Sequence, residues 1–213
     1  MGEQRLKKQF AFVEEIDKEK KIGRQTYLSD GNRKENDAEH AWHMAIMAYI
    51  LKEYAKEEID MLKTIVMILI HDIVEIDAGD TYAYDEEAKK TQNDREQAAA
   101  KRLYGLLPEG QGKELVKLWR EFDKGVTPEA RFARALDNIQ PMMLNSLSGG
   151  KSWKENSVAL SQILKRNQNT SLGSQMLWEY AKENYIKPNI KAKNIYDDSK
   201  SDLPSSGFTK TSD

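Results

Sequence analysis

Several residue types and patterns are missing or scarce in this sequence. There is no cysteine, and there are only three histidines and five prolines. Without cysteine, a disulfide scaffold, thiolate zinc ligands and a cysteine nucleophile are excluded. The longest uninterrupted apolar run, Ile65 to Ile70, is far too short to span a bilayer. We therefore expect no membrane partner.

Neither sign of charge dominates the chain. Its 33 basic and 35 acidic residues give a formal net charge of −2. Proteins that bind nucleic acids usually carry a basic excess or a basic stripe, so the near balance argues against a nucleic-acid partner. The first ten residues, MGEQRLKKQF, lack the apolar stretch of a signal peptide. Together with the absence of cysteine, this leads us to expect a cytoplasmic protein.

A helical pattern runs through almost the whole chain. Segments rich in Ala, Leu, Glu, Lys and Met alternate with short breaks, and no stretch shows the sustained alternation of a half-buried strand. We predict an all-α fold, a compact multi-helix bundle over residues 1–192, followed by a polar, disordered tail over residues 193–213. The predicted helices span residues 4–20, 36–55, 60–76, 94–107, 109–122, 128–147, 153–167 and 172–192.

Two of these helices carry specific local signals. Asn36 and Glu39 have the spacing of a capping box, which predicts that a helix begins there. The helix predicted over residues 60–76 is apolar almost all round, which predicts that it is buried on every side.

The scarcity of histidine makes the three positions informative. His71 lies in the most apolar helix, next to Asp72 and one turn before Glu75. Buried acidic groups are costly unless they are paired, hydrogen-bonded or bound to metal, so a divalent cation is one explanation for this group. His40 and Asp137 are the natural further ligands.

Each of these residues also has a simpler interpretation. A single His-Asp pair occurs by chance, and Asp137 alone is more often a capping or salt-bridged residue. His43 is better explained as a residue on the helix face, or one that supports a ligand, than as a ligand itself.

Taken together, the motifs match a known pattern. The order His40, then HDIVEIDAGD at residues 71–80, then RALDNI at residues 134–139, resembles the HD-domain phosphohydrolase superfamily. The similarity is closest to the branch that includes the bacterial 5′-deoxynucleotidases, and it extends over most of residues 5–190.

The resemblance implies an all-α fold, one bound divalent metal ion and a homodimer. The donor set, with imidazole and carboxylate but no thiolate, suits Mn, Co, Fe, Zn or Mg. The implied metal ligands are His40, His71, Asp72 and Asp137. The implied catalytic acids and bases are Glu75 and Asp80, and the implied phosphate-binding residues are Arg24 and, on weaker grounds, Arg33.

One position departs from the pattern of that branch. In its best-known members a tryptophan follows the loop arginine and helps to exclude a ribose 2′-hydroxyl. This chain has Gln25 there, so strict selection of deoxyribose does not follow from the resemblance.

The function implied is hydrolysis of a (deoxy)nucleoside 5′-monophosphate to nucleoside and phosphate, with a small phosphorylated molecule as the partner. Two alternatives remain open at this point. HD-domain sites also cleave phosphodiesters, nucleoside triphosphates and alarmones. The chain could also be a metal-stabilised helical binding protein without turnover, although such a protein would have no need of Glu75 and Asp80.

Overall fold

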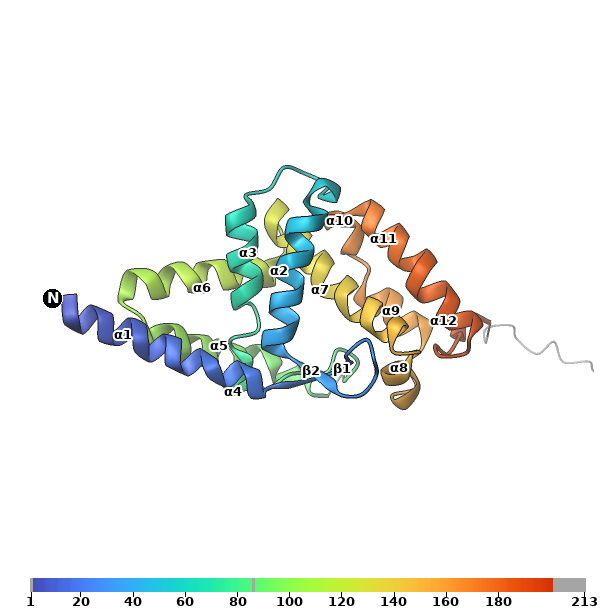
Figure 1. The fold of residues 1–213 in the computed structure, drawn as a ribbon, viewed down its shortest axis with the longest axis horizontal. Helices are drawn as coiled ribbons and strands as arrows, with labels where there is room; N and C mark the ends of the chain where they lie inside the picture. Colours follow the sequence, from blue (N-terminus) through green and yellow to red (C-terminus); the bar gives the residue numbers. More distant parts are fainter. Residues whose placement is uncertain (1, 86, 201–213) are drawn as a thin grey trace, which may run out of the picture.

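The structure is a computed structural model that describes residues 2–85 and 87–200. Helices make up most of these residues, and only a small two-stranded sheet interrupts them, so the prediction of an all-α fold is confirmed (Figure 1). The longer helices are α1 (Gly2–Glu15), α2 (Asp37–Leu51), α3 (Met61–Ile70), α5 (Lys89–Leu103), α6 (Glu109–Lys124) and α7 (Pro128–Leu147). The shorter helices are α4 (Glu75–Ala78), α8 (Lys151–Glu155), α9 (Leu160–Arg166), α10 (Thr170–Gly173), α11 (Gln175–Ala181) and α12 (Lys187–Lys191).

The central element is α7, against which α2, α3, α6, α10 and α11 all pack (Figure 1). Its bounds agree with the predicted helix over residues 128–147. Thr127 caps its first turn by accepting a hydrogen bond from the Ala130 amide, and Pro128 occupies the first turn, where no amide donor is needed. Fully buried Phe132 and Leu136 project from α7 into the core. The helix is therefore held on several sides, which fixes the side chains that it carries toward the site.

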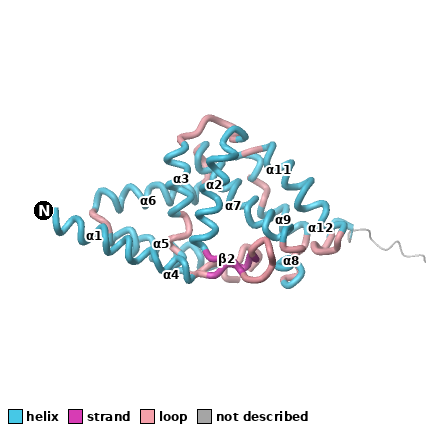
Figure 2. The backbone as a smooth tube through the Cα atoms, in the orientation of Figure 1, coloured by secondary structure: helices cyan, strands magenta, loops and turns pink. Residues whose placement is uncertain are grey.

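The small sheet was not predicted. Strands β1 (Gly23–Tyr27) and β2 (Lys34–Asn36) form an antiparallel hairpin that leads directly into α2 (Figure 2). Strands this short and polar show no alternation of apolar and polar residues over several positions, so the sequence gives no strand signal. The hairpin matters because it carries Arg24 to the beginning of α2.

The helix predicted over residues 60–76 is shorter than expected. Asp60 caps α3 by accepting a hydrogen bond from the Lys63 amide, and α3 ends at Ile70. Residues 71–74 form a turn before α4. The prediction that this helix is buried on all sides was also wrong, because Leu62 is 74% exposed and Leu69 is 42% exposed.

The last third of the chain is more broken than expected. The helix predicted over residues 153–167 is divided into α8 and α9, and the backbone at Ser157 between them has a positive φ of 48°. The helix predicted over residues 172–192 is divided among α10, α11, a π-helical turn at Lys182–Ile186 and α12.

The first residues of the predicted tail pack against the domain. Ile195 belongs to the buried core, and the Tyr196 amide donates to the Val158 carbonyl at 3.0 Å. Residues 201–213, most of the predicted tail, lie outside the described residues.

Two neighbouring helices leave a strip of apolar side chains uncovered. Four of them follow the i, i+4, i+7, i+8 spacing along α2, and two more belong to α3, which packs against α2 (Figure 1). We call this set the apolar face, and it consists of Trp42, Ile46, Tyr49, Ile50, Leu62 and Leu69. Among the described residues, none of the helices combines the length and the apolar character needed to cross a membrane.

Candidate active site

His71 and Asp72 lie in the turn that follows α3. The turn is tight, because the Glu75 amide donates to the Asp72 carbonyl at 2.8 Å, a bond to the third residue back rather than the fourth. Nδ1 of His71 lies 2.7 Å from the Ile68 carbonyl oxygen, which accepts its proton. The ring is therefore held in the tautomer that leaves Nε2 free to act as a ligand.

His40 is fixed by the beginning of α2. The predicted capping box is present: the Asn36 side chain accepts from the Glu39 amide, and the Glu39 side chain accepts from the Asn36 amide. His40 is fully buried one turn later, with Nδ1 3.0 Å from Oε1 of Gln140 on α7. Nε2 of Gln140 in turn donates to Glu35 at 2.9 Å and lies 3.3 Å from Nδ1 of His43. His43 thus contacts a residue that supports His40.

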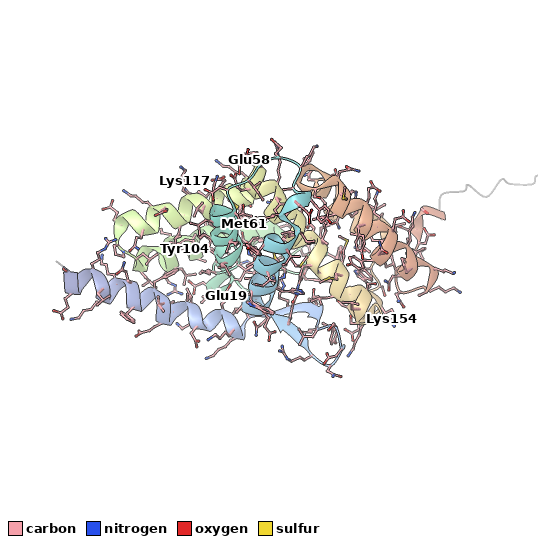
Figure 3. The ribbon with its side chains drawn as sticks, turned by 45° about the horizontal axis from the view of Figure 1, so that its top comes forward. Glu19, Glu58, Met61, Tyr104, Lys117 and Lys154 are labelled. Atoms are coloured by element: carbon pink, nitrogen blue, oxygen red, sulfur yellow. The ribbon has the colours of Figure 1, made fainter. Side chains whose placement is uncertain are left out.

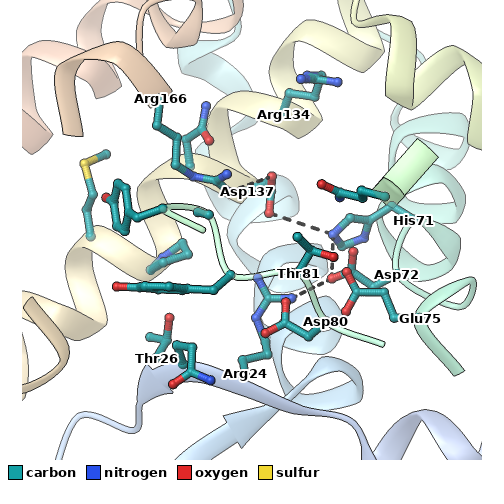
Figure 4. Close-up of a pocket in the computed structure, with 18 of the residues that line it drawn as sticks. Arg24, Thr26, His71, Asp72, Glu75, Asp80, Thr81, Arg134, Asp137 and Arg166 are labelled. Carbon is teal, nitrogen blue, oxygen red and sulfur yellow. Dashed lines mark hydrogen bonds and ion pairs between the residues drawn. The ribbon is translucent and has the colours of Figure 1, made fainter. Parts of the chain in front are cut away.

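The four predicted ligands converge on one point, and Figure 4 labels three of them, His71, Asp72 and Asp137. Nε2 of His40 lies 3.2 Å from Oδ1 of Asp137. Nε2 of His71 lies 3.0 Å from Oδ2 of Asp72 and 3.8 Å from Oδ1 of Asp137. Helix α2, the turn after α3 and helix α7 therefore bring two imidazoles and two carboxylates to one place, although His40 and Asp137 are 97 residues apart in the sequence.

This group fits a divalent cation. Nε2 of His71 is buried and has no hydrogen bond of normal geometry. In both histidines an oxygen acceptor holds the other ring nitrogen, the arrangement that metal-bound histidines nearly always show. A cation would match the Nε2 atoms of the two histidines and the two carboxylates together.

The electrostatics of the four side chains agree with that fit. Burial, reinforced by the charge of Arg24, lowers the pKa of His40 to about 4 and keeps its ring neutral. Burial would also lower the pKa of His71, but the Asp72 carboxylate outweighs it and the pKa rises to about 9. The negative charge that raises this pKa would also favour a cation beside His71. The pKa values of Asp72 and Asp137 fall below their usual range, because nearby positive charge outweighs their burial.

Arg24 lies against three acidic side chains at the edge of this group. Its Nη1 is 2.7 Å from Oδ2 of Asp72 and 3.2 Å from Oδ1 of Asp37, and its Nε is 3.5 Å from Oε1 of Glu35. Its side chain is only 11% exposed. The guanidinium therefore balances buried negative charge and at the same time faces the adjoining pocket.

Glu75 and Asp80 line the same pocket. Burial, and then the neighbouring Asp72 carboxylate, raises the pKa of Glu75 well above its usual range, and its Oε2 has no hydrogen-bond partner among the described residues. Burial also raises the pKa of Asp80. The sequence did not single out Asp37, whose carboxylate lies within 4.8 Å of those of Asp72 and Glu75. Burial, with the charge of Asp72, raises the pKa of Asp37 to about 8.

The pocket beside the four ligands has a volume of about 230 Å³. Ligand pockets typically measure about 300–1,000 Å³, so this one suits a small ligand. It extends from the ligands between β1, the segment after α4, α7 and the helices that follow (Figure 4). Its lining includes Arg24, Gln25, Thr26, Asp80, Tyr82, Tyr84, Asn145, Ser152, Trp153 and Arg166.

The two arginines that the sequence offered for phosphate binding are placed differently. Arg24 lies in the pocket, but Arg33 lies outside its lining, with Nη1 2.8 Å from Oε2 of Glu39 and its side chain 57% exposed. This position argues against a phosphate-binding role for Arg33.

Arg166, at the end of α9, was missed by the sequence reasoning. It lines the pocket and points toward Asp137, with Nη2 3.6 Å from Oδ2 (Figure 4). In the sequence it follows Lys165 in a charged stretch that looks like a solvent-exposed helix end. No local pattern distinguishes such an arginine from a surface one, because its role depends on where α9 packs.

The chain is similar to a family of known proteins and to a solved structure of a predicted metal-dependent phosphohydrolase. The family model described as HD domain matches residues 16–178, a span that contains every pocket residue named above. The crystal structure of a predicted metal-dependent phosphohydrolase from Magnetospirillum magnetotacticum MS-1 is similar, with a TM-score of 0.88 and 44% sequence identity over 92% of this chain and 98% of that chain.

Two curated relatives are also similar in sequence. The human 5′-deoxynucleotidase HDDC2 is 32% identical over 111 residues, which cover 52% of this chain and 53% of the relative. The Dictyostelium discoideum 5′-deoxynucleotidase HDDC2 is 32% identical over 114 residues, which cover 51% of this chain and 60% of the relative. The match thus spans only about half the length of the curated relatives.

Proposed function

Because this chain belongs to the HD domain family, we propose that it is a metal-dependent phosphohydrolase that converts nucleoside or deoxynucleoside 5′-monophosphates to nucleoside and phosphate. The observation that carries the proposal is the convergence of His40, His71, Asp72 and Asp137 beside a small pocket whose lining includes Arg24 and Arg166. The names of the curated relatives point to the same class of substrate. The small volume of the pocket favours a monophosphate over longer phosphate chains.

The proposed cofactor is one divalent cation held by these four side chains. Two imidazoles and two carboxylates suit Mn, Co, Fe, Zn or Mg. When bound, such an ion supplies positive charge for the phosphate oxygens and makes a water molecule more acidic.

Other side chains of the pocket bind the phosphate and transfer protons. Arg24 and Arg166 bind the phosphate oxygens through their N–H groups, and we assign to Arg166 the second phosphate contact that the sequence had suggested for Arg33. After burial, the charge of Asp72 is one cause of the raised pKa of Glu75, and a bound cation would offset that charge and favour the ionised carboxylate. The ionised Glu75 accepts the proton of the attacking water as the water oxygen bonds to phosphorus. Asp80, whose raised pKa favours its protonated form, donates a proton to the 5′ oxygen as the phosphorus–oxygen bond breaks.

Gln25 lies at the sugar side of this arrangement. It lines the pocket, and its Oε1 accepts a hydrogen bond from Nζ of Lys34 at 2.5 Å. A polar side chain here tolerates a ribose 2′-hydroxyl, so we propose that the enzyme hydrolyses AMP as well as dAMP.

The apolar face supports a further proposal, that the protein is a homodimer. Its location in the cytoplasm is a separate proposal, which rests on the absence of cysteine. Six large apolar side chains of α2 and α3 are between 42% and 74% exposed. A contiguous exposed apolar patch usually marks an interaction surface, and two copies related by twofold symmetry would bury the same patch on each other.

The test is phosphate release from a panel of nucleoside 5′-monophosphates, with AMP beside dAMP, in the presence of Mn or Co. We expect His71→Ala and Asp72→Ala to lower kcat by a factor on the order of 10³, because each removes a ligand of the cation. Variants that keep the wild-type rate would refute the proposal.

Arg166 and Arg33 provide a matched pair within the same assay. We expect Arg166→Ala to raise KM roughly tenfold through the loss of a charged hydrogen bond to phosphate. Arg33→Ala should leave KM unchanged, because Arg33 lies outside the pocket lining.

A further inference from the structure

Native proteins rarely leave buried polar atoms without a hydrogen-bond partner, so each such atom calls for an explanation. In the part of the chain that the structure describes, six of them lie in or behind the cluster around the four ligands: Glu19 Oε1, Arg24 Nε, Glu35 Oε1, Asp37 Oδ2, His71 Nε2 and Glu75 Oε2. The other two, Tyr82 Oη and Asn145 Oδ1, belong to neither the metal ligands nor their supports, yet both residues line the same pocket.

Asn145 marks the end of the pocket away from the metal ligands. It lies eight residues after Asp137 on α7, which places it about 12 Å farther along the helix axis. A nucleotide held by its phosphate beside Asp137 extends over a comparable distance to its base. Asn145 is only 7% exposed and lines the pocket, so its carboxamide is part of the buried pocket wall.

Tyr82 approaches this end from the segment that follows α4. Its hydroxyl lies near Ser152 of α8 but lacks the geometry of a hydrogen bond to it. The rings of Tyr82 and Tyr84 pack edge to face with centroids 5.3 Å apart, and Tyr84 and Trp153 also line the pocket. This end therefore combines aromatic surface with the unpaired carboxamide oxygen of Asn145 and the unpaired hydroxyl of Tyr82.

That combination suits the edge of a heterocyclic base. A carboxamide offers an acceptor and donors side by side, and a tyrosine hydroxyl can donate or accept. Aromatic rings provide the flat apolar surface against which a base can pack. A sugar hydroxyl or a phosphate would make no use of the aromatic rings.

We propose that Asn145 and Tyr82 form the nucleobase subsite of this pocket, a proposal that rests on the function proposed above. Oδ1 of Asn145 accepts a hydrogen bond from an N–H group on the edge of the base, and the Tyr82 hydroxyl makes a second polar contact to it. These two residues determine which bases the enzyme prefers, while the residues at the other end carry out the reaction.

The experiment compares kcat/KM for nucleoside 5′-monophosphates with kcat/KM for ribose 5-phosphate, which has the same ester but no base. We expect Asn145→Leu to lower the ratio of the two values roughly 10- to 100-fold, because a site that hydrogen-bonds a substrate group discriminates against its absence. Tyr82→Phe, which removes only the hydroxyl, should lower the ratio to a smaller degree.

A second asparagine gives the matched control. Asn189 is equally buried, but its Nδ2 donates to Ser146 at 2.9 Å and its Oδ1 accepts from Asn194 at 2.7 Å. Asn189→Leu should therefore lower the melting temperature and leave the ratio unchanged. Asn145→Leu should change the ratio without lowering the melting temperature, because Oδ1 of Asn145 has no protein partner to lose.

The outcomes separate this inference from the function on which it rests. If Asn145→Leu lowers kcat/KM equally for both substrates, Asn145 has a structural role and the subsite is refuted. The same holds if neither variant changes the ratio while the wild type hydrolyses nucleotides. If the wild type releases phosphate from no nucleotide and from no sugar phosphate, the proposed function itself is wrong and the subsite with it.

Discussion

Gln140 controls how His40 is presented to the proposed cation. Its Oε1 accepts the proton of His40 Nδ1, while its Nε2 donates to Glu35, so one buried amide sets both the tautomer and the orientation of the ring. Partners of this kind affect metal affinity although they never touch the metal.

We expect Gln140→Leu to weaken metal binding roughly 10- to 100-fold, because the His40 ring loses the acceptor that orients it. Metal content after dialysis against graded concentrations of a chelator measures the change. Gln162→Leu is the control, since Gln162 caps α9 through the Ala159 amide and lies outside the site. Equal metal affinity in the two variants would contradict the role assigned to Gln140.

Glu19 is a second buried group with a measurable consequence. It follows α1 and is only 7% exposed (Figure 3). Burial, and then the charge of Asp72, raises its pKa from the ordinary 4.5 to about 7. Because the folded state holds the proton more tightly than the unfolded state, this group costs stability as the pH rises from about 4.5 through about 7.

In the metal-free protein, Glu19→Gln should therefore gain stability over the wild type as the pH rises through this window. The free energy of unfolding of Glu19→Gln minus that of the wild type should be larger at pH 8 than at pH 4. The increase is on the order of 3 kcal/mol, because each unit of pKa shift corresponds to about 1.4 kcal/mol. Urea unfolding at the two pH values measures it. Glu14→Gln, an exposed change on α1, should show no such dependence, and a pH-independent difference for Glu19→Gln would count against the assignment.

Some individual residues could be placed from the sequence, and others could not. His40, His71, Asp72 and Asp137 were grouped correctly in space, because rare histidines and acidic residues in apolar helices are costly without a common purpose. Their role as metal ligands stays a prediction. The sequence did not identify three further residues of the site, Asp37, Asn145 and Arg166. Nothing in their local sequence separates them from ordinary capping or surface residues. Only the packing of distant elements places them in the pocket.

The beginnings of α2 and α7 were predicted correctly where a local capping motif marks them, and the end of α3 was predicted wrongly where none does. The capping box before α2 and the Thr-Pro pair before α7 were read correctly, because both act within a few residues. The end of α3 was read wrongly, because the apolar pattern continues through Ile73 and Val74 while the backbone already turns. The hairpin that carries Arg24 was missed because its strands are held by their position beside α2.

The capping box of α2 gives a test at this scale. Asn36→Ala should lower the free energy of unfolding by about 1 kcal/mol, because the Glu39 amide loses its acceptor. Asn36→Asp keeps that acceptor and should retain most of the stability. Chemical denaturation of the three proteins measures the differences, and an alanine variant as stable as the wild type would show that this cap contributes nothing.

For the molecule as a whole, the apolar face of α2 and α3 predicts assembly. The wild type should have twice the chain mass of 24.5 kDa in solution. Ile46→Asp combined with Leu62→Asp should give a particle of one chain, because each charge would be buried in the interface. Light scattering during size-exclusion chromatography measures both masses.

The matched control for that experiment is Val126→Asp. Val126 is 60% exposed, like members of the apolar face, but lies outside it between α6 and α7. This variant should keep the wild-type mass. If the wild-type protein has the mass of a single chain, the proposed homodimer is refuted.

The length of α7 has a consequence for how such an enzyme diversifies. One helix carries Asp137 near its middle and Asn145 near its far end, more than two turns apart. Changes at position 145 can therefore accumulate in a lineage without disturbing the residues that hold the cation. New substrate preferences would then arise by single substitutions, while the chemistry that they depend on is inherited unchanged.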